Sequence, residues 1–164
     1  MIYITGDTHG QFGCIETFCE RFGISREDIL INLGDARINF SGWNRDCMKK
    51  RFLESLPVTL FCIHGNHEQR PQTIGSYREK QWHGWWPDEQ PSDEIKRYVE
   101  SQLDKLDWKV DVVLSHTTPL KYEPVEVFLS GVDQSKVDKS TEKWLDGIED
   151  RLDYQKWYCG HYHT

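Results

Sequence analysis

Five short apolar runs recur along the chain, and each is followed within two residues by glycine, histidine, aspartate or asparagine. The runs are rich in β-branched, leucine and aromatic residues, a composition typical of β-strands. The expected strands cover residues 2–5, 29–33, 59–63, 110–114 and 157–159. Stretches with apolar residues at helical spacing lie between them, at residues 15–22, 43–56, 95–106 and 144–152. This alternation predicts right-handed βαβ units with a parallel sheet, and therefore the α/β fold class.

Serine residues are expected to begin two of the helices. Ser92 precedes Asp93 and Glu94, whose negative charges are favourable in the first turn of a helix. Ser140 is expected to cap the last helix in the same way.

Size and charge restrict the class of protein. A chain of 164 residues is about one domain, since domains typically run to ~100–200 residues. With a net charge of -7, the chain lacks the broad basic surface that binding of long duplex nucleic acid requires. No apolar run approaches the ~18 residues of a membrane span, and the first residues do not have the pattern of a signal peptide. Five cysteines without a Cys-x-x-Cys pair favour reduced thiols, so we expect a cytoplasmic protein that does not associate with membranes.

The polar residues that follow the expected strands share one position. In a parallel sheet the carboxyl ends of the strands lie on one edge, where open α/β folds bind their ligands. Each fragment alone is a weak signal, because Gly-Asp is usually a turn and a lone histidine is usually structural. Five fragments at five successive strand ends are much harder to attribute to chance. The residues expected to converge are Asp7, His9, Asp35, Asn66, His67, His116, His161 and His163.

Imidazole and carboxylate donors without thiolate suit Mn, Fe, Zn or Ni ions. There are more of these donors than one tetrahedral ion can bind, so we expect two metal ions. Two metal ions can clamp the attacking and the leaving oxygen of a displacement at phosphorus. Their charge would exceed that of Asp7, Asp35 and a bridging hydroxide, and the surplus would attract a phosphate ester.

In order along the chain, these residues resemble the motifs of the calcineurin-like metallophosphoesterase superfamily. The matching fragments are Asp7-x-His9, Gly34-Asp35, Gly65-Asn66-His67-Glu68, His116 and Gly160-His161-x-His163. The resemblance runs from the first residues to the last. It implies a hydrolase with two divalent metal ions, for which we expect Mn²⁺, with Fe, Zn or Ni as alternatives. The implied reaction is hydrolysis of a phosphomonoester or phosphodiester by in-line attack of a metal-bridging hydroxide.

The resemblance also divides the residues between roles. It implies that Asp35 bridges the two ions and that His67 is catalytic, stabilising the transition state or protonating the leaving oxygen. The ligands implied for the first ion are Asp7, His9, Asp35 and His163. Those implied for the second are Asp35, Asn66, His116 and His161.

Departures from the protein-phosphatase branch of that superfamily concern the substrate. Ile38 stands where that branch has a second aspartate, Asn39 where it has a phosphate-binding arginine, and His64 where it has another arginine. A protein-phosphatase role is therefore not favoured, and the acidic net charge fits a small or nucleotide-like phosphate ester. Arg37 either binds the substrate phosphate or faces solvent, and the sequence does not distinguish between these two interpretations.

Two further departures concern the fold, which in this superfamily is an αββα sandwich. Fewer than twenty residues separate Glu68 from Pro87, and the chain ends at Thr164. We therefore expect a single domain over residues 1–164, shortened near residues 82–86 and truncated after 164, with the first sheet intact and the second reduced or partly missing. Residues 121–129 are the only other strand candidate, weakened by Pro124. An uncovered apolar sheet face would favour an oligomer.

Two alternatives remain. Trp82, Trp85 and Trp86 could stack on a nucleobase or simply pack within the fold. The chain could also be a non-catalytic scaffold of this fold that binds partner proteins. The complete ligand set favours the enzyme, because degenerate scaffolds usually lose ligands.

Overall fold

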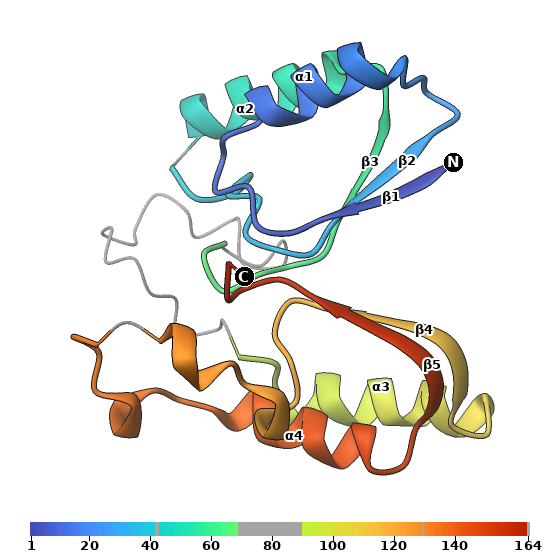
Figure 1. The fold of residues 1–164 in the computed structure, drawn as a ribbon, viewed down its shortest axis with the longest axis vertical. Coiled ribbons are helices and arrows are strands. Elements are labelled where there is room, and N and C mark those ends of the chain that lie inside the picture. Colours follow the sequence, from blue (N-terminus) through green and yellow to red (C-terminus); the bar gives the residue numbers. More distant parts are fainter. Residues whose placement is uncertain (42, 69–89, 129, 164) are drawn as a thin grey trace. The chain divides into compact units, whose positions relative to one another are not determined.

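The computed structural model describes residues 1–41, 43–68, 90–128 and 130–163. The chain divides into two compact units, one ending at residue 89 and one beginning at Gln90. The described residues form four α-helices and five strands, and every strand pair is parallel (Figure 1). The predicted α/β class is confirmed.

The first unit holds a three-stranded parallel sheet in the order β1-β2-β3. Its elements in chain order are β1 (Ile2–Thr5), α1 (Gly13–Phe22), β2 (Ile29–Asn32), α2 (Trp43–Ser55) and β3 (Thr59–Cys62). Tyr3, Leu30 and Leu60 share one row of the register, as do Thr5, Asn32 and Cys62. The three carboxyl ends of the strands are therefore level with one another.

The core of this unit lies between the sheet and its two helices, which cover the same face of the sheet (Figure 1). Ile15 and Leu53, from α1 and α2, are buried with Leu30 of β2. Side chains alternate between the two faces of a strand, so Ile2 and Phe61 belong to the opposite face. Both are exposed, at 67% and 60%.

The second unit holds a two-stranded parallel sheet of β4 and β5, in which Ser115 pairs with Cys159. Its elements in chain order are α3 (Asp93–Lys105), β4 (Lys109–Ser115), η2 (Leu120–Tyr122), η3 (Val125–Val127), η4 (Gln134–Lys136), α4 (Ser140–Glu149) and β5 (Asp153–Cys159). The three η elements are short 3-10 helices.

Ser92 is the predicted N-cap of α3, and its hydroxyl accepts a hydrogen bond from the backbone N–H of Ile95 at 3.3 Å. The same prediction for Ser140 is wrong, because Ser140 is the first residue of α4. Its own N–H donates to Oδ1 of Asp138 at 2.9 Å.

The strand expected over residues 121–129 is also wrong, since η2 and η3 cover much of this segment. Pro124 lies between them and cannot donate to a β-ladder. The prediction of one sheet edge for all five strands needs correction as well, because β1, β2 and β3 pair in one sheet and β4 and β5 in another. Apolar patterning marks a strand but does not specify which strands exchange hydrogen bonds.

The proposed shortening near residues 82–86, together with Trp82, Trp85 and Trp86, lies outside the described residues. Within the described residues, no helix combines the length and the apolar character that crossing a membrane requires.

Candidate metal centre

Three loops of the first unit meet at Asp35. Asp7 and His9 follow β1, Asp35 follows β2, and His67 follows β3. The backbone N–H of His9 donates to the carbonyl oxygen of Asp35 at 2.8 Å. The backbone N–H of His67 donates to Oδ1 of Asp35, also at 2.8 Å. Hydrogen bonds from the main chain therefore bring together three of the predicted site residues, His9, Asp35 and His67. Asn66 lies in the same loop as His67.

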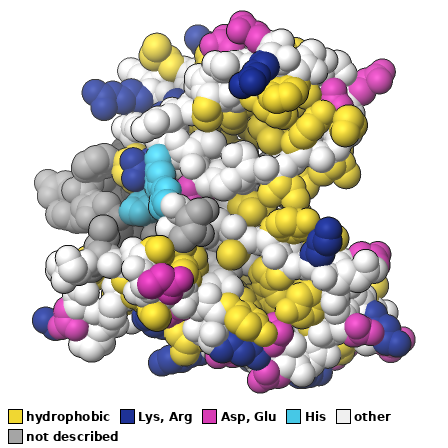
Figure 2. Space-filling model, viewed as in Figure 1, with side chains coloured by type: hydrophobic (Ala, Val, Ile, Leu, Met, Phe, Trp, Pro, Cys, Tyr) yellow, Lys and Arg dark blue, Asp and Glu magenta, His cyan; other side chains and the backbone are white. Residues whose placement is uncertain are grey.

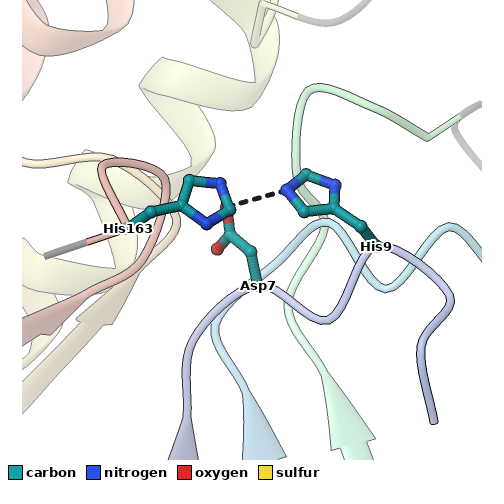
Figure 3. A group of neighbouring side chains, drawn as sticks. All are labelled: Asp7, His9 and His163. Atoms are coloured by element: carbon teal, nitrogen blue, oxygen red, sulfur yellow. Dashed lines mark ion pairs between the residues drawn. The ribbon is translucent and has the colours of Figure 1, made fainter. Parts of the chain in front are cut away.

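The side chains at this point combine buried carboxylates with accessible imidazoles. The His9 Nε2 lies 3.9 Å from Oδ2 of Asp7, an ion pair marked in Figure 3. The His67 Nε2 lies 4.0 Å from Oδ2 of Asp35. The aspartate side chains are 2% and 1% exposed and the imidazoles 22% and 33%. Figure 2 shows histidine side chains reaching the molecular surface.

This donor set fits a divalent metal ion. Buried carboxylates are costly without a compensating positive charge, and carboxylate with imidazole is the combination that Mn, Fe and Zn accept. The rings of His9 and His67 lie close together, with their centroids 5.6 Å apart.

The backbone of these loops adopts unusual conformations. His9 and Asp35 have positive φ angles of 47° and 48°, which few residues other than glycine adopt. Gly65 has a different constraint, since a Cβ atom built on it would overlap the backbone nitrogen and the carboxylate of Asp35. The close approach of the loop after β3 to Asp35 therefore depends on glycine at position 65.

Two buried residues that the sequence did not single out as functional support this group. Asn32, at the end of β2, donates to the carbonyl oxygen of Gly6 at 2.9 Å and accepts from the N–H of Gly34 at 3.1 Å. Glu68 is only 6% exposed, and its Oε1 accepts from the N–H of Ile38 at 3.4 Å. Burial, reinforced by the negative charge of Asp35, raises the pKa of Glu68 to about 7. The position of Glu68 directly after His67 was the available signal.

Arg37 lies two residues beyond Asp35, and its backbone has a φ of 53°. Its guanidinium lies over the ring of Phe40, 4.8 Å from the centroid. Its Nε is buried and makes no hydrogen bond with the residues that the structure describes. Lys49 of α2 stabilises this loop with two hydrogen bonds. Its Nζ donates to the carbonyl oxygen of Arg37 at 2.7 Å and to Oγ of Ser41 at 3.1 Å.

In the second unit the structure brings His116 and His161 together. The N–H of Gly160 donates to the carbonyl oxygen of His116 at 2.9 Å, which links the loops after β4 and β5. The two imidazole rings are edge to face, with centroids 5.0 Å apart. His161 and His163 both have positive φ angles, 71° and 56°. Each predicted histidine of this unit therefore lies just after a strand end, as the sequence indicated.

The sequence model of a protein family described as calcineurin-like phosphoesterase matches residues 1–164. No curated protein and no solved structure matches the chain. The family match implies metal-dependent hydrolysis of phosphate esters in general, with divalent metal ions as cofactors. It confirms the predicted superfamily for a short member. The chain belongs to the calcineurin-like phosphoesterase family.

Proposed function

We propose that this protein is a binuclear metal-dependent phosphoesterase that hydrolyses a phosphomonoester or phosphodiester. The observation that carries the proposal is the arrangement at Asp35. This buried carboxylate accepts the His67 N–H, and its other oxygen lies 4.0 Å from the His67 imidazole. The residue proposed to bridge two ions is thus adjacent to the residue proposed to act on the substrate.

The proposed ligands follow the motif assignment. Asp7, His9, Asp35 and His163 would hold one ion, and Asp35, Asn66, His116 and His161 the other. The donor chemistry supports Mn²⁺, with Fe, Zn or Ni as alternatives. When bound, the ions would supply Lewis acidity toward phosphoryl oxygens and lower the pKa of water.

His67 is the proposed catalytic residue. Its imidazole is 33% exposed, so a substrate can reach it, while its backbone is fixed by Asp35. The ring can donate a proton to the leaving oxygen or a hydrogen bond to the phosphoryl group in the transition state. Arg37 is the proposed phosphate-binding residue, because a guanidinium can donate two parallel hydrogen bonds to a phosphate.

The family match over the whole chain supports, as a further proposal, one domain with an αββα sandwich. The net charge of -7 supports a small or nucleotide-like substrate rather than long duplex nucleic acid. We also propose a cytoplasmic location on the grounds of cysteine usage. Self-association is proposed from the exposed apolar residues of the first sheet, among them Ile2 and Phe61.

Steady-state hydrolysis of p-nitrophenyl phosphate and bis-p-nitrophenyl phosphate with Mn²⁺ tests the proposal. We expect turnover by the wild-type protein and none by His67→Ala or Asp35→Asn. His83→Ala is the matched control, because His83 is the one histidine that follows no predicted strand. Turnover that survives both site variants would place the activity elsewhere. A folded protein that binds metal without turnover would instead favour the non-catalytic scaffold.

A further inference from the structure

A hydrogen bond between two side chains in the second unit joins the two loops that carry histidines. Thr117 directly follows His116, and Tyr162 stands between His161 and His163. The Oγ1 of Thr117 and the phenolic oxygen of Tyr162 are 3.1 Å apart. The hydroxyl of Thr117 and the phenol of Tyr162 thus connect the loop after β4 with the loop after β5.

Burial strengthens the case that this hydrogen bond matters. Thr117 is only 7% exposed, so water competes little for the bond. Its loss would leave a buried polar group unsatisfied.

Tyr162 is in turn in contact with a metal-ligand candidate. Its ring is edge to face with that of His161, the centroids 4.8 Å apart. Phe128 stacks against the Tyr162 ring at 6.1 Å, with 18° between the planes. The ammonium of Lys139 lies 4.9 Å from the centroid of Phe128 and is ion-paired with Glu123. The phenol ring is therefore held on its face and at its hydroxyl.

The loop of Thr117 is fixed by a second set of contacts. The hydroxyl of Ser115 donates to the carbonyl oxygen of Thr117 at 2.5 Å and accepts from the indole N–H of Trp157 at 2.7 Å. Trp157 belongs to β5, so these bonds tie the end of β4 to the neighbouring strand. A shift of Thr117 would consequently move His116 relative to His161.

We infer that Thr117 and Tyr162 are positioning residues that fix the mutual orientation of His116 and His161 for metal binding. This inference rests on the proposed function, in which both histidines are ligands of one ion. Neither residue is a proposed ligand, and each acts through a neighbouring histidine. Partners in the outer shell of a metal site typically change metal affinity by ~10–100-fold when removed.

The test is Co²⁺ binding to the full chain, followed by titration and by the visible absorption spectrum. We expect Thr117→Val and Tyr162→Phe each to weaken one of two binding steps by ~10–100-fold and to change the spectrum. Tyr158→Phe is the matched control, since it removes the same hydroxyl from an exposed tyrosine of β5. The control should leave both quantities unchanged.

A double variant separates a shared hydrogen bond from general loosening of the fold. Thr117→Val and Tyr162→Phe break the same bond, so the double variant should lose less affinity than the product of the two single losses. A double-variant loss of Co²⁺ affinity equal to the product of the two single losses would overturn the inference. A wild-type affinity and spectrum in Tyr162→Phe, the more conservative variant, would overturn it as well. A wild-type protein that binds no Co²⁺ would overturn the proposed function and this inference together.

Discussion

The backbone N–H of His67 donates to Oδ1 of Asp35 at 2.8 Å, while the imidazole Nε2 of His67 lies 4.0 Å from Oδ2 of the same carboxylate. One side chain thus positions the main chain of His67 and lies next to its ring. Changes at Asp35 are expected to affect metal binding and the geometry of the proposed catalytic residue together.

Asp35→Asn should keep the acceptor for the His67 N–H and lose the negative charge. After dialysis against Mn²⁺ we expect nearly two ions per wild-type chain and a sharp fall in the variant, because a neutral amide is a poor bridging ligand. Metal analysis per chain measures this. Asp153→Asn, at the exposed start of β5, should bind as wild type. Near-zero metal in folded wild-type protein would refute the binuclear assignment.

Gly65→Ala should destabilise the first unit, because its Cβ would overlap the backbone and carboxylate of Asp35. Overpacking of this kind costs ~1–3 kcal/mol. Gly147→Ala is the opposite case, since that glycine lies within α4 and has no atom within 4 Å of a built Cβ. It should stabilise the protein by about 0.5–1 kcal/mol. Urea unfolding of metal-free protein compares them, and equal midpoints for the two variants would contradict the predicted difference.

Lys49→Met should loosen the loop that carries Arg37, because it removes the bonds from Nζ to the Arg37 carbonyl and to Ser41. We expect a loss of ~1–2 kcal/mol in unfolding free energy. If Arg37 binds the substrate phosphate, KM should rise more than kcat falls. Lys50→Met, at the adjacent exposed position, is the control. Indistinguishable kinetics for the two variants would show that the hydrogen bonds of Lys49 do not affect substrate binding.

The stability of the metal-free protein should depend on pH through Glu142. Burial raises the pKa of Glu142 above its ordinary value of 4.5, and the nearby Glu123 carboxylate adds to this. Hydrogen bonding to the carboxylate and the positive charge of Lys139 act in the opposite direction.

The folded state therefore holds the Glu142 proton more tightly than the unfolded state. The resulting stabilisation is fully present below pH 4.5 and is lost as the pH rises through the folded pKa. Glu142→Gln should remove this component, so the wild-type protein should lose stability relative to the variant over that interval. Urea unfolding at a series of pH values, with Glu126→Gln as an exposed control, measures it. A difference that rises with pH would reverse the predicted sign.

The sequence predicted the elements well because their apolar patterns are local. The run at residues 29–33 became β2, with Leu30 buried against α1 and α2, and the polar residues fell just after the strand ends as expected. The pairing of β4 with β5 in a separate sheet did not follow from the apolar patterns, since it depends on which strands meet in space. Only the family resemblance led us to expect a second sheet. Ser140 shows a similar limit, because a serine before an apolar stripe can be a cap or a first helical residue.

The supporting residues of the site were missed for a related reason. Lys49 contacts a loop twelve residues before it, and Thr117 contacts Tyr162, which lies 45 residues further along the chain. Such contacts depend on the folded arrangement and leave no spacing pattern in the chain. Asn32 was missed for a different reason. It is a polar residue at the end of an apolar strand, and the sequence pattern does not show whether such a residue is buried or faces solvent.

The left-handed backbone at His9, Asp35, His161 and His163 narrows the set of amino acids that these positions tolerate. A replacement there must satisfy the side-chain chemistry and also a conformation that β-branched residues avoid strongly and that aspartate, asparagine and histidine accept more readily. In a saturation library selected only for folded protein, these four positions should therefore already be depleted of valine and isoleucine and enriched in glycine and asparagine. Backbone geometry would thus restrict these positions even when metal binding is not selected. Comparing the amino acids accepted in libraries grown with and without the metal ion would separate the two restrictions.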